Sequence, residues 1–179
     1  MKKTKKVIFS MLIVLLVSSC SPETELKEVD FSIVDGYYNC TPNEVVNYIN
    51  STNLDDNYYI IPEFQETGEE IAINGDAGTT DIYLTFITNI DGKVTEIEFN
   101  FLSAQASEQS AKSFTHYLTV ILTKIVSNTE TVDLLIKDVL NSSSNNNQGL
   151  ILKGTNDVLC TTQSGMCLVI IRPSEIHNK

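Results

Sequence analysis

Four cysteines are the residues of this chain whose side chains could do covalent chemistry: Cys20, Cys40, Cys160 and Cys167. A thiolate can act as a nucleophile, bind a metal or join a disulfide. Nucleophilic catalysis also needs a base close to the thiol, and the chain has 2 histidines. The positions of those histidines therefore decide whether a thiol enzyme is a reasonable prediction.

Neither histidine is well placed as a base or as a metal ligand. His116 lies about 180° from the centre of the apolar stripe of a predicted helix, so we expect it to face solvent. His177 falls in residues 174–179, which we predict to be a frayed tail. No spacing of Cys and His suits structural zinc, and the common hydrolase and nucleotide-binding motifs do not occur. The sequence therefore predicts no catalytic residue, no metal site and no cofactor.

Carboxylates are the other candidate for chemistry, because two acids can together hydrolyse a glycosidic bond. Glu96 and Glu98 share the polar face of one predicted strand, where solvated charge is the common explanation. The segment 74–81 offers oxygen ligands for Ca²⁺, but it lacks the ligand spacing and terminal Glu of an EF-hand loop. We therefore keep a carboxylate hydrolase as an alternative and predict no calcium site.

Cys160 and Cys167 flank a predicted turn. If residues 162–165 form a four-residue loop, the two cysteines lie directly opposite each other, a position that allows a disulfide. A turn centred on Ser164-Gly165 would instead misalign them and leave two separate buried thiols. Both interpretations stay open, and so does a pairing of Cys40 with either cysteine.

The first 19 residues have the organisation of a secretion signal. Lysines at positions 2, 3, 5 and 6 precede an apolar run over 7–17, and small residues follow it. The run is about eleven residues long, whereas a permanent membrane helix needs roughly twenty. We therefore predict that residues 1–19 are a cleaved signal peptide.

The tetrad Val17-Ser18-Ser19-Cys20 resembles the lipobox of bacterial lipoproteins: an aliphatic residue, two small residues and the Cys that is lipidated. The resemblance covers only the first twenty residues. It implies that Cys20 carries diacylglycerol and an N-acyl chain such as palmitate, and that it becomes the N-terminus. Each buried methylene contributes about 0.8 kcal/mol, so such an anchor would attach the protein stably without spanning the membrane.

Residues 20–30 form the lipidated Cys and a predicted flexible, acidic tether. Ser21 resembles the residue type that permits outer-membrane sorting in Gram-negative bacteria, and the acidic stretch resembles surface-export signals of some Bacteroidetes. The resemblance implies the bacterial cell envelope and favours the outer membrane over the plasma membrane. The net charge of −11 argues against a nucleic-acid partner.

Residues 31–173 are predicted to form a single α+β domain, an antiparallel sheet with helices packed on one face. The predicted helices cover about 42–51, 107–126 and 127–140. The predicted strands cover 57–61, 70–74, 81–90, 93–102 and 149–153, and strand character returns over 158–172 on both sides of a turn at 162–165. The Ser/Asn run over 141–148 is predicted to be a loop.

The clearest local pattern is a hairpin around Asp91-Gly92, a dipeptide favoured in two-residue type I′ turns. This turn pairs Ile90 with Lys93. Counting outward places apolar residues opposite each other in three pairs: Phe86 and Ile97, Leu84 and Phe99, Ile82 and Phe101. The sheet should therefore have one core side and one solvated side.

Composition and motifs together favour a non-catalytic lipoprotein whose domain binds a protein or a small ligand in the cell envelope. A carboxylate hydrolase is one alternative, and it requires two acids with opposed pKa shifts in a pocket. The other alternative is a carrier of an apolar ligand, which requires a lined cavity between the helices and the sheet.

Overall fold

A computed structural model of the chain describes residues 28–53, 57–66, 68–74, 80–126, 129–145, 148–152 and 155–174. Six antiparallel strands form one sheet in the order β3-β4-β5-β8-β7-β6. These strands are β3 (Glu70–Asn74), β4 (Thr80–Thr88), β5 (Val94–Phe101), β6 (Gln148–Leu152), β7 (Asn156–Gln163) and β8 (Met166–Pro173). A separate small hairpin pairs β1 (Ile33–Val34) with β2 (Tyr37–Tyr38).

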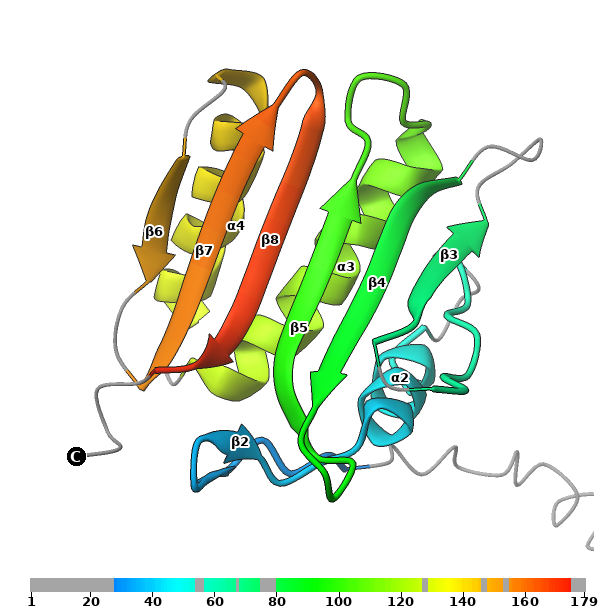
Figure 1. Cartoon of the computed structure of the whole chain (residues 1–179). Coiled ribbons are helices and arrows are strands. Elements are labelled where there is room, and N and C mark those ends of the chain that lie inside the picture. Colours follow the sequence, from blue (N-terminus) through cyan, green and yellow to red (C-terminus); the bar gives the residue numbers. More distant parts are fainter. Residues whose placement is uncertain are drawn as a thin grey trace, which may run out of the picture.

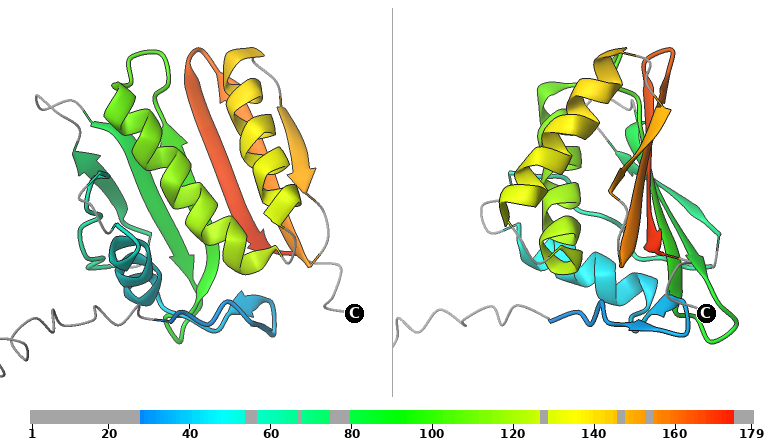
Figure 2. Two further views of the ribbon diagram at one scale, coloured as in Figure 1. Left: turned by 180° about the vertical axis from the view of Figure 1, so that it is seen from behind. Right: turned by 90° about the vertical axis from the view of Figure 1, so that its left-hand side faces the viewer.

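Two long helices, α3 (Glu108–Ile125) and α4 (Thr129–Asn145), cover one face of the sheet (Figures 1 and 2). The opposite face carries no helix within the described ranges, and the shorter helix α2 (Pro42–Ser51) lies near β3 and β4 at one end of the molecule (Figure 1). The predicted α+β architecture, with helices on one face of an antiparallel sheet, is confirmed.

The start of α2 follows from its sequence. The Thr41 hydroxyl accepts a hydrogen bond from the Glu44 backbone N–H (3.4 Å), and the Glu44 carboxylate accepts one from the Thr41 N–H (2.7 Å). This reciprocal capping box, with Pro42 at the first helical position, satisfies backbone donors that a helix start otherwise leaves unpaired.

The predicted register of the β4–β5 hairpin is confirmed in the strands, with the pairs Ile82–Phe101, Leu84–Phe99 and Phe86–Ile97. The predicted turn is wrong. The Asn89 N–H donates to the Lys93 carbonyl (2.9 Å), so the loop has three residues, and it ends on Gly92 at φ 74°. A register shift beyond Ile87 accommodates the extra residue. Ile90 is therefore not paired with Lys93, and it is fully exposed at the tip.

Helix α3 covers the apolar face of this hairpin, as expected. The Phe114 ring stacks on Phe101 with 4.4 Å between centroids, and it meets Phe99 edge-on at 6.1 Å. The start of α3 is fixed by Asp81 of β4, whose buried carboxylate accepts a hydrogen bond from the Ser110 hydroxyl at 2.7 Å. The position of α3 on the sheet is thus set by both ring packing and a buried polar contact.

Two predicted elements differ from the structure. Residues 57–61 form no strand, although they are rich in β-branched and aromatic side chains. Helix α4 extends to Asn145, so the first part of the predicted Ser/Asn loop is helical. Ser and Asn are weak helix formers, but that stretch contains no Gly or Pro to stop the helix.

The folded region begins and ends slightly outside the predicted limits of 31 and 173. Val29 is buried, and the Asp30 carboxylate accepts a hydrogen bond from the Ser32 N–H (2.9 Å). At the other end, Ser174 is buried and its N–H donates to the Thr155 carbonyl (2.9 Å). The folded domain therefore includes residues that the sequence pattern assigned to the tether and the tail, and Val29 is part of the hydrophobic core.

Candidate functional site

The segment over 57–64 is held beside α2 and α3 by asparagine side chains rather than by a neighbouring strand. Asn50 bonds both the N–H and the carbonyl of Ile61 (3.0 and 2.8 Å), and Asn43 bonds both groups of Phe64 (2.7 and 3.1 Å). Because side-chain amides satisfy these backbone groups, the segment needs no partner strand. This explains why the strand predicted there does not form.

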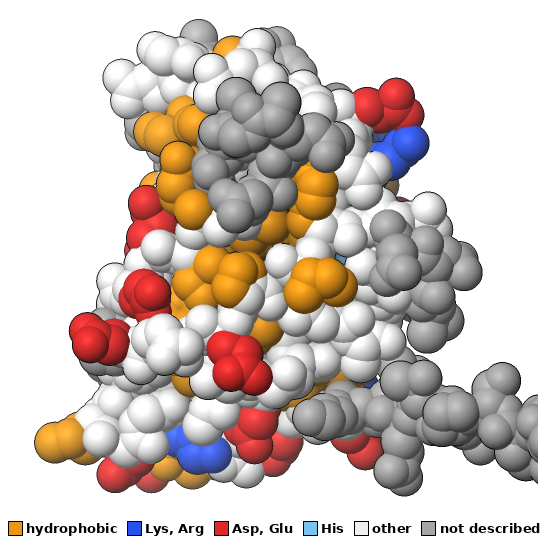
Figure 3. Space-filling view, turned by 90° about the vertical axis from the view of Figure 1, so that its right-hand side faces the viewer, with side chains coloured by type: hydrophobic (Ala, Val, Ile, Leu, Met, Phe, Trp, Pro, Cys, Tyr) orange, Lys and Arg blue, Asp and Glu red, His pale blue; other side chains and the backbone are white. Residues whose placement is uncertain are grey.

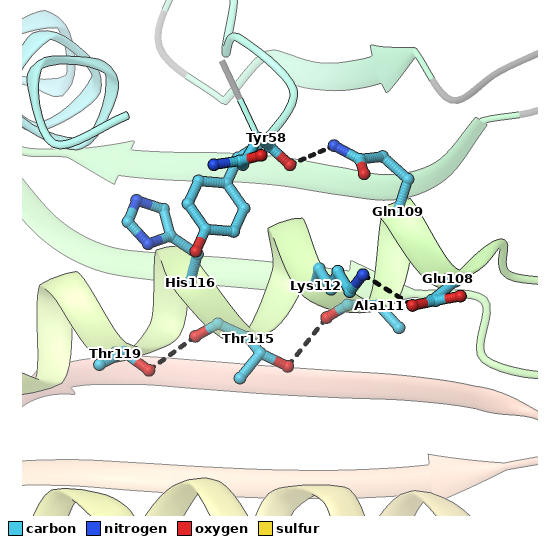
Figure 4. Close-up of a pocket in the computed structure, with 9 residues that line it drawn as sticks. Tyr58, Glu108, Gln109, Ala111, Lys112, Thr115, His116 and Thr119 are labelled. Carbon is cyan, nitrogen blue, oxygen red and sulfur yellow. Dashed lines mark hydrogen bonds and ion pairs between the residues drawn. The ribbon is translucent and has the colours of Figure 1, made fainter. Parts of the chain in front are cut away.

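Asn53 makes the same pair of bonds with Tyr58, accepting from its N–H (3.3 Å) and donating to its carbonyl (2.9 Å). The next residue along, Tyr59, donates its N–H to the Ser113 hydroxyl of α3 at 3.1 Å. These bonds position the segment beside the outer face of α3, and a groove of about 760 Å³ lies between them (Figure 4). The groove is lined by Asn57, Tyr58, Glu108, Gln109, Ala111, Lys112, Thr115, His116 and Thr119.

His116 forms one end of this groove and is half-buried, not solvent-facing as predicted. Its ring stacks on Tyr58 with 3.9 Å between centroids and an interplanar angle of 5° (Figure 4). The helical periodicity placed His116 correctly on the side of α3 away from the sheet. The predicted solvent exposure of His116 was wrong, because the segment 57–64, which is distant in sequence, covers that side of the helix.

The protonation of His116 follows from its neighbours. Its Nε2 lies 2.9 Å from the Thr52 hydroxyl, and that hydroxyl donates its own proton to the Ile49 carbonyl at 2.6 Å. Thr52 can therefore only accept, so Nε2 carries the proton and Nδ1 is left as an acceptor. Burial lowers the pKa of His116, which favours this neutral form.

The floor of the groove is a row of small side chains along α3. Thr115 and Thr119 each donate a hydroxyl proton to the carbonyl four residues earlier, at 2.8 Å in both cases (Figure 4). Their hydroxyl oxygens remain acceptors, and their methyl groups add apolar surface beside Ala111. An ion pair of Lys112 with Glu108, 2.6 Å apart and largely exposed, supplies charge at the edge.

Sequence reasoning missed the groove residues other than His116. The available signal was Thr115, Thr119 and Thr123 at four-residue spacing on the polar side of a helix that also carries His116. No local pattern shows that residues 57–58 come to lie on that side.

Cys160 and Cys167 do not lie directly opposite each other, because the turn between β7 and β8 has two residues, Ser164 and Gly165, both at positive φ. Cys160 is paired with Val169, so the two cysteines are diagonal neighbours on the core face. Of the two turns that the sequence left open, the four-residue loop is wrong and the turn centred on Ser164-Gly165 is confirmed. The sulfur atoms are nevertheless only 3.6 Å apart, both buried and unbonded.

The three buried thiols of Cys160, Cys167 and Cys40 differ in their pKa values. The hydrogen bond with Cys167 lowers the pKa of Cys160, whereas that bond and burial raise the pKa of Cys167. Burial raises the pKa of Cys40 to about 12, which leaves that third thiol protonated and unreactive at neutral pH.

Glu96 and Glu98 lie on the sheet face opposite the helices, as predicted, but neither is fully solvated. The Glu96 side chain is 16% exposed and pairs with Arg172 of β8 at 3.4 Å. Burial and the neighbouring Glu96 and Glu70 carboxylates raise the pKa of Glu98. Across this sheet Glu98 is paired with Ile170, so the acids sit next to apolar side chains.

Several predicted features fall outside the described residues: the signal peptide, the lipobox with Cys20, His177, and the loop centred on residues 75–79. In the part of the chain that is described, no three His, Cys, Asp or Glu side chains are grouped so as to hold a metal ion. No helix within the same ranges is both long and apolar enough to cross a bilayer.

Comparison with known proteins gives no relative: no family model, no curated protein and no solved structure matches this chain.

Proposed function

We propose that this protein is a lipid-anchored, non-catalytic binding protein of the bacterial cell envelope, attached to the outer membrane through Cys20. The lipobox supports the anchor. The groove beside α3 is the observation that supports binding, because its volume of about 760 Å³ lies within the usual range of small-molecule sites.

The groove suits a compact ligand that has both apolar surface and hydrogen-bonding groups. The Tyr58 ring and the methyl groups of Ala111 and Thr115 offer apolar contact. Lys112 offers a positive charge, and the threonine hydroxyls accept hydrogen bonds. A small polar molecule or a short peptide has the matching chemistry.

The contacts of His116 favour binding over catalysis. A histidine that acts as a general base is usually oriented by a carboxylate and faces a nucleophile. His116 instead contacts a threonine and a tyrosine ring. In this arrangement the imidazole positions the Tyr58 wall of the groove.

The binding proposal is tested by filling the groove. Thr115 and Thr123 lie on the same helix and make the same hydrogen bond to the preceding turn, but only Thr115 lines the groove. Chemical-shift mapping with a set of sugars, amino acids and short peptides should show a ligand that shifts the amides of Ala111, Thr115 and Thr119. Thr115→Leu should abolish those shifts, and Thr123→Leu should leave them unchanged. Equal effects of the two variants would contradict the proposal.

A carboxylate hydrolase is the second candidate, favoured by the raised pKa of Glu98 beside Glu96. It predicts turnover of peptidoglycan or ester substrates that Glu98→Gln abolishes. Such turnover would replace the non-catalytic proposal. A carrier of apolar ligands has weaker support, because the groove lies outside α3 and not between the helices and the sheet.

A further inference from the structure

The end of the molecule that carries the β4–β5 turn presents an isolated apolar side chain to solvent. Ile90 is fully exposed at the tip of the turn. The turn around it is well ordered by hydrogen bonds, since the Asn89 side chain accepts from the N–H groups of both Asp91 (3.0 Å) and Lys93 (2.9 Å). The fold therefore holds Ile90 outward, away from any core contact.

Two other exposed apolar side chains belong to different surfaces: Ile87 of β4 (41% exposed) is paired with Glu96 on the solvated face of the sheet, and Val34 (40% exposed) lies in β1 of the separate hairpin. The β1–β2 hairpin and the β4–β5 turn lie at the same end of the sheet (Figure 1). On the side of the molecule seen in Figure 3, hydrophobic side chains gather over the middle and upper part of the face, and acidic side chains lie mainly below and beside them. The tip differs from these because its apolar residue projects alone from the end of the sheet.

The start of the described chain is beside this tip. The Asn39 side chain donates to the Asp30 carboxylate at 2.6 Å, and the Asn39 carbonyl accepts from Lys93 Nζ at 3.5 Å. Eight residue steps separate Cys20 from Glu28. Even fully extended they span at most about 29 Å, so an anchor on Cys20 keeps this end of the domain near the bilayer.

We infer that Ile90, at the tip of the β4–β5 turn, inserts into the surface of the bilayer in which the protein is anchored. This inference rests on the proposed acylation of Cys20. The same end carries the acids Glu28, Asp30, Asp35 and Asp91 with Lys93 among them. Repulsion of anionic headgroups by these acids makes a zwitterionic surface the better partner.

A spin label at position 90 tests this insertion. The acylated full-length mature protein is reconstituted into phosphatidylcholine vesicles as Ile90→Cys, with Met166→Cys as the matched control. Met166 is an exposed apolar residue (43%) beside the β7–β8 turn at the opposite end of the sheet (Figure 1). The native Cys40, Cys160 and Cys167 are buried and should not take the label.

The label at position 90 should lose accessibility to a water-soluble relaxant and gain accessibility to oxygen on reconstitution, whereas the label at position 166 should show neither change. Phosphatidylglycerol added to the vesicles should weaken the effect. Equal exposure of both labels to the water-soluble relaxant would overturn the insertion of Ile90 into the bilayer.

The intact mass of the same sample separates the two proposals, the lipid anchor on Cys20 and the insertion of Ile90. An acylated chain with an exposed label at position 90 overturns only the insertion. A chain without acyl groups overturns the anchor and this inference with it.

Discussion

The imidazole of His116 sits between Tyr58 and Thr52, where its neutral form is favoured because burial lowers its pKa below the ordinary 6.5. A lowered pKa in the folded state means that the unfolded chain binds a proton more readily. The stability that neutral His116 contributes to the folded protein is therefore present above about pH 6.5. It is lost as the pH falls through the lowered pKa of His116 in the folded state.

Replacement of His116 tests this linkage. The free energy of unfolding of the unmodified protein should fall as the pH drops below about 6.5, and His116→Gln should show a shallower fall because glutamine does not titrate. Denaturant unfolding at a series of pH values measures both slopes. All other titrating groups are the same in the two proteins. If the free energy of unfolding changes with pH equally in both, the pKa of His116 is not lowered by folding, and the prediction is contradicted.

The thiols of Cys160 and Cys167 are close enough for oxidation to require only a small movement of two side chains. In an oxidising compartment we expect them to form a disulfide, with the loss of one hydrogen from each thiol to the compartment's thiol oxidant. Alkylation of the denatured, acylated protein should then modify Cys40 alone before reduction and three thiols after it, measured by intact mass. Three modified thiols without prior reduction would show that the pair stays reduced.

At the scale of the elements, the turn between β7 and β8 is packed against the loop that follows β5. The Gly165 carbonyl accepts from the N–H of Ala104 (3.2 Å) and from the Ser103 hydroxyl (3.0 Å). A Cβ at position 165 would lie only 2.4 Å from the Ala104 Cβ. Gly165 thus provides a positive φ of 81° and also permits this close approach.

Gly92 is a matched control for Gly165, because it has a similar φ of 74° but a Cβ added there would meet nothing within 4 Å. Gly92→Ala should cost about 1 kcal/mol of stability, from the backbone conformation alone. Gly165→Ala should cost roughly 1–3 kcal/mol more, from overpacking against Ala104. Thermal or denaturant unfolding gives both values, and equal costs would contradict the packing of the turn on the loop.

Helix and strand patterns were reliable where the determining contacts are local. The capping box at Thr41 predicted the start of α2, and alternation on either side of Asp91-Gly92 predicted the strand register. The bulge after Ile87 could not be predicted, since a two-residue and a three-residue turn leave the same residues paired further along. The fold class therefore followed from the sequence, while the tip geometry required the structure.

The groove could not be predicted because it is made by contacts between distant segments. Asn50 and Asn53 have the composition expected of a helix end, and nothing local shows that their amides bind Ile61 and Tyr58. Those bonds in turn bring Tyr58 over His116. The groove can be recognised only in the three-dimensional structure, where α2, the segment 57–64 and α3 contact one another.

At the scale of the whole molecule, two three-stranded antiparallel units join through their last strands, β5 and β8, to form one sheet. Phe99 of the first unit is paired with Val169 of the second, and both are completely buried. The core is thus shared by both units. One end of this single domain carries the start of the described chain and the exposed tip (Figure 1), and our proposal places this end toward the membrane.

Anchoring of this domain to a membrane through Cys20 is tested most directly by the intact mass of the protein extracted from bacterial membranes. We predict a chain that begins at Cys20 and carries diacylglycerol and an N-acyl chain. We also predict that a Cys20→Ala variant is neither acylated nor recovered with the membrane. An unacylated, soluble product from the unmodified gene would contradict the anchor and remove the main support for an envelope lipoprotein.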